Sequence, residues 1–135
     1  MTGVDTSGLV DAARKARERA YSPYSGVKIG AAVLTEGGAV YTGANVENAS
    51  YGLSCCAERT AMFKAVSEGA RKILAIAVVG KSEQFTRPCG ACRQVMVEFN
   101  PEMAVMMRGV DGFSADATAK SLLPAAFNPP ELSKR

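Results

Sequence analysis

The chain has 135 residues, of which 47% are hydrophobic and 21% are charged, and its formal net charge is +3. This composition excludes a disordered chain, and the net charge is too small to indicate a surface for nucleic acid. The absence of histidine excludes Ser-His-Asp and Cys-His catalytic groups and every histidine-ligated metal site. We expect a single domain over residues 1–135, with a polar tail from about residue 129.

The first part of the chain predicts a helix followed by a β-hairpin. Residues 5–20 place apolar side chains on one face at helical spacing, and Thr6 or Ser7 can cap this helix. Its basic residues between positions 14 and 19 are predicted to form a solvated face. Residues 27–34 and 39–46 have the character of strands, and the glycine-containing turn between them indicates a hairpin.

The rest of the chain predicts alternating helices and strands. The expected elements are a helix over 57–68, a strand over 72–80, a helix over 89–99 and a strand over 103–108. Residues 122–127 have the pattern of a short helix broken at its proline. Strands that alternate with helices predict an α/β layered fold around one sheet.

Four cysteines, at positions 55, 56, 89 and 92, are the candidates for chemistry. The N-terminus has no basic-then-apolar signal pattern, and the longest strongly apolar run, over 73–79, is far shorter than the roughly 20 residues of a membrane span. We therefore expect a cytoplasmic protein with no membrane partner. Disulfides are disfavoured in that compartment, so a metal site or a redox motif is the better interpretation.

Three of these cysteines are predicted to hold one zinc ion. Cys89 and Cys92 lie three apart at the start of a helix and therefore on one face, and Cys56 opens the other helix. The positive end of each helix favours thiolate over thiol. Three thiolates would leave a fourth position on the metal open, as in catalytic zinc sites. Glu58, two residues after Cys56, is placed to move a proton beside the metal.

The charge of three thiolates must be offset if the metal is to acidify water. We expect Arg59 to hydrogen-bond a sulfur for this purpose, with Gln94 as a second candidate. Two other interpretations of the cysteines stay open: a closed four-sulfur site that includes Cys55, and a thioredoxin-like redox pair. Outside such a site, Cys55 is expected to be a small buried hydrophobic residue.

Cys56-Ala57-Glu58 followed by Pro88-Cys89-x-x-Cys92 is the zinc deaminase signature, with a cysteine where histidine is usual. From about residue 21 to 127 the sequence resembles the small cytidine deaminases that use three cysteines. The resemblance is carried by six blocks in order: Tyr-Ser-Pro-Tyr-Ser at 21–25, Gly-Ala-Ala at 30–32, Asn-Val-Glu-Asn-Ala-Ser-Tyr-Gly at 45–52, Cys-Ala-Glu-Arg-Thr-Ala at 56–61, Pro-Cys-Gly-Ala-Cys-Arg-Gln-Val at 88–95 and Leu-Leu-Pro-Ala-Ala-Phe at 122–127.

This resemblance implies a three-layer α/β/α sandwich around one mixed sheet of about five strands. It implies one Zn²⁺ per chain on Cys56, Cys89 and Cys92, with Glu58 as the proton shuttle. The implied reaction is the hydrolytic deamination of cytidine and deoxycytidine to uridine and deoxyuridine in pyrimidine salvage. The implied assembly is a homotetramer with shared active sites.

The resemblance also implies substrate contacts. Asn45 and Glu47 match the family's ribose readers, and residues i and i+2 at a strand end do point the same way. Without the resemblance, a turn formed by Asn45 and Asn48 is the simpler interpretation. The other implied contacts are Ala57, whose backbone would face the pyrimidine, and three residues that match those reaching a neighbouring subunit's nucleoside: Ala49, Tyr51 and Phe127. From the sequence pattern alone, Phe127 would be a core or tail-docking residue.

One position departs from the family pattern: Val27 stands where a phenylalanine commonly packs over the substrate. Its smaller side chain would leave room for a substituent on the exocyclic amine. An alternative function is therefore a related deaminase for a modified or amine-substituted cytidine-type nucleoside. A non-catalytic zinc or nucleoside-binding module is a third interpretation, which the intact Glu58 disfavours. Polynucleotide editing is disfavoured by the absence of a basic or aromatic groove.

Overall fold

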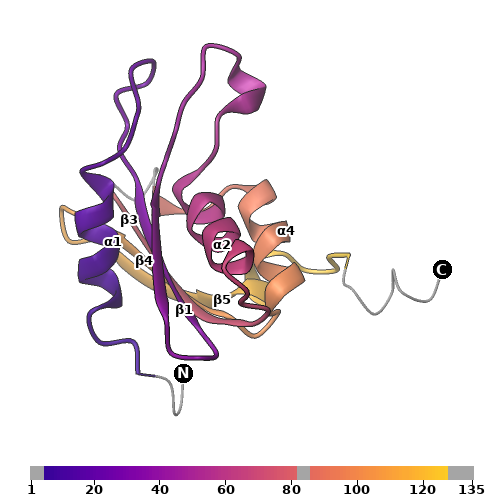
Figure 1. The fold of residues 1–135 in the computed structure, drawn as a ribbon. Coiled ribbons are helices and arrows are strands. Elements are labelled where there is room, and N and C mark those ends of the chain that lie inside the picture. The colour runs from indigo at the N-terminus through magenta and orange to yellow at the C-terminus, as the bar shows by residue number, and fades with distance from the viewer. Residues whose placement is uncertain (1–4, 82–85, 128–135) are drawn as a thin grey trace.

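The computed structural model describes residues 5–81 and 86–127, and within these ranges one mixed five-stranded sheet forms the centre of the molecule (Figure 1). Its strand order is β2-β1-β3-β4-β5. The β3–β4 pair is parallel, and the other three pairs are antiparallel. The strands are β1 (Gly30–Thr35), β2 (Val40–Ala44), β3 (Ile73–Gly80), β4 (Ala104–Gly109) and β5 (Ser114–Thr118).

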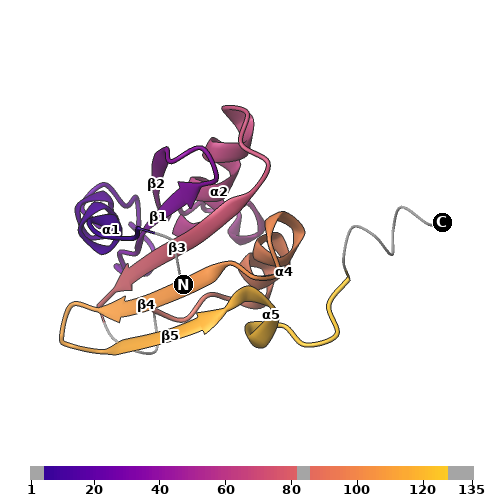
Figure 2. The same cartoon turned by 90° about the horizontal axis from the view of Figure 1, so that it is seen from below.

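Helices cover both faces of the sheet, as Figures 1 and 2 show. On one face lies α1 (Leu9–Arg17), and on the other lie α2 (Ala57–Ser67) and α4 (Gly90–Phe99), with the short α5 (Ala119–Leu122) beside α4. The predicted α/β/α sandwich with one mixed sheet is therefore confirmed. Its two hydrophobic cores follow from the alternation of side chains along the buried strands, where even and odd positions face opposite layers.

The β-hairpin is confirmed, and its turn uses a glycine in the left-handed region. Gly38 has a φ of +88°, which residues with a side chain rarely adopt. Its amide donates to the Thr35 carbonyl oxygen at 3.0 Å, and the Thr35 amide donates to Ala39 at 2.9 Å. Both strands are shorter than predicted, and residues 27–29 lie before β1 rather than in it.

The first helix begins later than predicted and is not capped by Thr6 or Ser7. Its N-cap is Gly8, which makes no side-chain cap. The Ser7 hydroxyl instead donates to Asp5 at 2.7 Å, and Thr6 contributes only its carbonyl oxygen, to the amide of Leu9. The predicted solvated face of this helix is confirmed for Arg14, Lys15 and Arg19, whereas Arg17 is half-buried.

The C-terminal prediction was wrong in two respects. Strand β5 was missed, because its sequence, Ser-Ala-Asp-Ala-Thr, has no large apolar residue and forms a strand by pairing with β4. A short helix was expected over 122–127, but the helix of this region is α5, which lies earlier, at Ala119–Leu122. It is capped by Thr118 through a reciprocal pair of hydrogen bonds with Ser121. The tail predicted from about residue 129 lies outside the described residues.

In the part of the chain that the structure describes, no helix combines the length and the apolar character that a membrane crossing requires.

Candidate zinc centre and active site

The N-termini of α2 and α4 meet at one end of the sheet. Cys56 is the N-cap of α2 and Cys89 is the N-cap of α4, both with extended backbones, and Cys92 lies in the first turn of α4. Gly43 of β2 lets α2 approach the sheet here, because a Cβ at this position would come within 2.8 Å of the Ala57 carbonyl oxygen. The fold thus brings two cap cysteines and a first-turn cysteine to one place.

The geometry of the three thiols suits a tetrahedral zinc ion. The Sγ atoms of Cys56 and Cys89 lie 3.7 Å apart, and those of Cys89 and Cys92 lie 3.5 Å apart. All three sulfurs lie within 4.8 Å of one another. Zinc–sulfur bonds of about 2.3 Å at the tetrahedral angle set sulfurs about 3.8 Å apart, and a disulfide would require about 2.05 Å. The three cysteines therefore fit one Zn²⁺ and are not joined by a disulfide.

Cys55 is not part of this cluster. Among the described residues, the group of thiols close enough to share a metal comprises Cys56, Cys89 and Cys92. Cys55 is half-buried rather than buried as expected, and its sulfur accepts a hydrogen bond from the Thr60 hydroxyl at 3.6 Å. The closed four-sulfur arrangement therefore has no support from the geometry, because adjacent residues aim their side chains in different directions.

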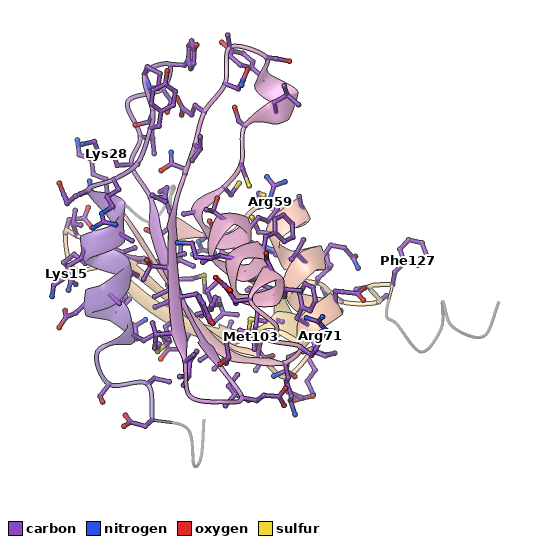
Figure 3. The ribbon with its side chains drawn as sticks, viewed as in Figure 1. Lys15, Lys28, Arg59, Arg71, Met103 and Phe127 are labelled. Atoms are coloured by element: carbon purple, nitrogen blue, oxygen red, sulfur yellow. The ribbon has the colours of Figure 1, made fainter. Side chains whose placement is uncertain are left out.

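Arg59 brings a positive charge to the cluster (Figure 3). Its Nη2 donates to the Cys56 sulfur at 3.3 Å. A hydrogen bond with Cys92 and the bond from Arg59 lower the pKa of Cys56 to about 5, whereas the bond to Cys56 and burial raise the pKa of Cys92. The guanidinium therefore favours the thiolate form of Cys56.

The second candidate for such a bond, Gln94, does not reach the cluster. Its Nε2 donates instead to the Phe127 carbonyl oxygen at 3.2 Å. Gln94 follows Cys92 by two residues, which corresponds to about 200° around a helix and turns the two side chains to opposite sides. The expectation for Gln94 was therefore wrong.

Glu58 is a buried carboxyl beside the cluster, with only 4% of its surface exposed. Burial raises its pKa to about 7, and the nearby Cys56 charge adds to this effect. A carboxyl with a pKa near neutrality can both accept and release a proton at physiological pH. The first turn of α2 thus places a proton-transferring group against the metal ligands.

A cavity of about 530 Å³ opens in front of Glu58. Six residues predicted as substrate contacts or as the shuttle line it together with Cys56, Cys89 and Arg59: Val27, Asn45, Glu47, Tyr51, Ala57 and Glu58. A larger hollow of about 730 Å³ lies over β3, β4 and β5, but its lining includes no cysteine and no predicted site residue. The residues that can carry out chemistry therefore favour the smaller cavity as the substrate site.

Two of the predicted contacts lie away from this cavity. Ala49 is exposed and is not part of its lining. Phe127 is 62% exposed and lies beyond α4, on the segment that leaves the body of the domain (Figure 3). Neither Ala49 nor Phe127 lines the substrate cavity of its own chain.

Two loops form the outer wall of the cavity. Residues 21–29 run beside residues 45–55, and Val46 forms isolated bridges with Tyr21 and Cys55. The side-chain amide of Asn45 joins the two loops: its Nδ2 donates to the Val27 carbonyl oxygen and its Oδ1 accepts from the Ile29 backbone amide, both at 2.8 Å. Asn48, not Asn45, makes the local turn, because its Oδ1 accepts from the amide of Ser50 at 2.9 Å.

Glu47 is bound to the same loop through Ser25, which lies in the Tyr-Ser-Pro-Tyr-Ser block at 21–25 but for which the sequence predicted no role. The Ser25 hydroxyl donates to one oxygen of the Glu47 carboxylate, and the amides of Tyr24 and Ser25 donate to the other at 3.0 and 3.1 Å. These partners are 22 and 23 residues apart in the chain. No local pattern in the sequence marks such a long-range contact.

Comparison with known proteins places the chain in a family. The family model "Cytidine and deoxycytidylate deaminase zinc-binding region" matches residues 5–108. A cytidine deaminase of Sporosarcina psychrophila is 48% identical over 131 residues, covering 96% of both chains, and one of Halalkalibacterium halodurans is 49% identical over 131 residues, covering 96% of this chain and 99% of the relative. The crystal structure of a cytidine deaminase from Burkholderia pseudomallei superposes with a TM-score of 0.87 at 50% identity, over 92% of this chain and all of the other. The chain therefore belongs to the cytidine and deoxycytidylate deaminase family.

Proposed function

We propose that this enzyme deaminates cytidine and deoxycytidine hydrolytically, to uridine and deoxyuridine with release of ammonia, as a step of pyrimidine salvage. The observation that carries the proposal is the buried Glu58, which faces a 530 Å³ cavity next to a three-thiol cluster suited to zinc. The relatives that share about half of the sequence and carry the name cytidine deaminase support the same substrate. A redox role for the cysteines has no comparable support.

The chemistry divides between the metal and the buried carboxyl. Zinc, when bound by Cys56, Cys89 and Cys92, supplies a nucleophile at neutral pH because it lowers the pKa of water. The conversion of cytidine and water to uridine and ammonia moves one proton to the ring nitrogen and one to the leaving amine. We assign both transfers to Glu58, because it is the buried carboxyl that lines the cavity beside the three thiols.

The remaining lining residues orient the substrate. We assign the backbone of Ala57 to the pyrimidine, because this residue separates the metal ligand Cys56 from Glu58. Asn45 and Glu47 are assigned to the sugar hydroxyls, since both line the same cavity at its outer wall. Arg59 is assigned to the offset of thiolate charge through its bond to Cys56.

The function is tested by incubating zinc-loaded protein with cytidine and following the ultraviolet change to uridine, with Glu58→Gln in parallel. Turnover by the wild type and its loss in the variant are the expected results. One bound zinc per chain without ammonia release would instead indicate a binding module. The thiol cluster must stay reduced to hold zinc, and we therefore infer the cytoplasm as its compartment.

We further propose a homotetramer in which Ala49, Tyr51 and Phe127 reach the nucleoside of a neighbouring subunit. Large apolar side chains exposed on this chain support an interface: Tyr51 is 79% exposed, Leu53 70%, and Phe127 62%. Light scattering at working concentration is expected to give four times the chain mass. A mass equal to one chain would contradict the proposal.

A second candidate substrate class is cytidine with a substituted exocyclic amine, and the observation that favours it is the aliphatic Val27 in the cavity wall. Val27→Phe is expected to lower KM for cytidine by about 2- to 12-fold, equivalent to about 0.5–1.5 kcal/mol of aromatic contact. The same change is expected to slow turnover of amine-substituted cytidines, because the larger ring fills the space. Steady-state kinetics on both substrates check this.

Val27→Leu is the matched control, since it adds volume without an aromatic ring. If Val27→Phe alters neither cytidine affinity nor the use of substituted cytidines, Val27 has no part in specificity.

A further inference from the structure

The Glu47 carboxylate is held by the loop that faces it. The amides of Tyr24 and Ser25 donate to Oε1 at 3.0 and 3.1 Å, and the Ser25 hydroxyl donates to Oε2. A carboxylate offers about four acceptor positions, so about one is left on Oε2 for a further donor. These bonds also hold the pKa of Glu47 below its ordinary value, with the Ser25 hydroxyl as the largest cause, so the group remains an acceptor.

The direction of the Ser25 hydroxyl proton is fixed by its second partner. The amide of Val27 donates to the Ser25 oxygen at 3.0 Å, so this oxygen accepts from Val27 while its proton points to Glu47. The chain of donors therefore runs from the Val27 amide through Ser25 to Glu47. Ser25, Val27 and Glu47 all line the substrate cavity.

Asn45 holds a different part of the same loop. Its amide binds the Val27 carbonyl oxygen and the Ile29 amide, which keeps residues 27–29 in place without Ser25. Loss of the Ser25 hydroxyl thus removes only the bond to Oε2 of Glu47, because the amides of Tyr24 and Ser25 still hold Oε1 and Asn45 still holds the inner end of the loop. This separation of roles makes Ser25 testable apart from loop structure.

We propose that Ser25 is a positioning residue, whose hydroxyl turns the remaining acceptor position of Glu47 toward a sugar hydroxyl of the substrate. The inference rests on the proposed function, in which Glu47 contacts the sugar. Because deoxycytidine is a proposed substrate, the relevant hydroxyl is the 3′ or the 5′ group, which both nucleosides share.

The test compares Ser25→Ala with the wild type on deoxycytidine, 2′,3′-dideoxycytidine and 2′,5′-dideoxycytidine. Ser25→Ala is expected to raise KM for deoxycytidine about tenfold and to change kcat less than about twofold, because the lost hydrogen bond orients a carboxylate that binds the sugar, away from the reacting atoms. The increase in KM caused by Ser25→Ala is expected to vanish for the analogue that lacks the hydroxyl to which Glu47 binds. Ser25→Thr, which keeps a hydroxyl, is expected to restore most of the affinity.

Ser22→Ala is the matched control, because it removes a hydroxyl from the same loop at a residue outside the cavity lining. An equal penalty on all three substrates would assign Ser25 to loop structure and overturn the proposal, as would no penalty on any. The dissociation constant of deoxyuridine, measured by calorimetry for the same variants, separates the two proposals. Absence of turnover in the wild type would refute the deaminase function, while a tenfold weaker deoxyuridine affinity in Ser25→Ala would still support the positioning role. A wild type that neither deaminates deoxycytidine nor binds deoxyuridine would refute both.

Discussion

Glu58→Gln is expected to bind cytidine and zinc but to deaminate cytidine at least about 100-fold more slowly than the wild type, because a positioned acid–base group contributes about 10²–10⁴-fold to a rate. The side chain is 4% exposed, so bulk water has little access to replace it as a proton carrier. Glutamine has the same size and keeps a polar group, but its amide cannot take up a proton and release it again. The loss should therefore fall on kcat.

The measurements are the ultraviolet rate of uridine formation and the zinc content of the same preparation. Glu68→Gln is the matched control, because Glu68 is an exposed carboxyl at the other end of the same helix. It is expected to retain the full rate. A Glu58→Gln rate within about tenfold of the wild type, with zinc in place, would remove Glu58 from both proton transfers.

Much of the metal cluster was predictable from sequence, because its Cys89–Cys92 and Cys56–Arg59 contacts are fixed by local helix geometry. Cys89 and Cys92 face one way because they lie one turn apart at the start of α4. Cys56 occupies the N-cap of α2, which corresponds to the place of Cys89 on α4. Only the meeting of the two helix ends depends on the tertiary fold, and the α/β pattern already predicts helices packed side by side on one face of a sheet. Arg59 follows for the same reason, since it lies three residues after Cys56 on the same helix.

Other features could not be predicted, because they depend on partners distant in sequence. The Ser25–Glu47 bond joins residues 22 apart, and neither residue is part of a local motif that would reveal the other. Strand β5 forms on the edge of β4 from a sequence with little strand character of its own. The short helix expected over 122–127 ends at Leu122 instead, and Leu123 and Ala126 beyond it pack against the core without forming a helix.

The second large effect is expected at the zinc ligands, where two adjacent cysteines allow a direct comparison. Cys56→Ser should weaken zinc binding by more than about 100-fold. Mutation of a residue that only hydrogen-bonds a metal ligand already lowers metal affinity by about 10–100-fold. Cys55→Ser should leave zinc affinity within about threefold of the wild type, because Cys55 lies outside the thiol cluster. Both affinities can be measured by competition with a chromogenic chelator.

Arg59→Gln belongs in the same titration as an intermediate case. The variant keeps all three thiols but loses the guanidinium that donates to Cys56 at 3.3 Å. Zinc affinity is expected to fall by about 10–100-fold, the usual cost of losing a partner that orients and neutralises a ligand. Unchanged zinc affinity and rate would leave Arg59 without a role in charge compensation.

The order of the three affinities distinguishes the possible ligand sets. If the metal has three thiolate ligands and an open position, Cys55→Ser binds zinc like the wild type, Arg59→Gln binds it more weakly, and Cys56→Ser binds it most weakly. If Cys55 were a fourth ligand, Cys55→Ser and Cys56→Ser would weaken binding to a similar extent. A fourth protein ligand would leave no open position on the metal for water. That result would contradict the deaminase mechanism, which requires such a position.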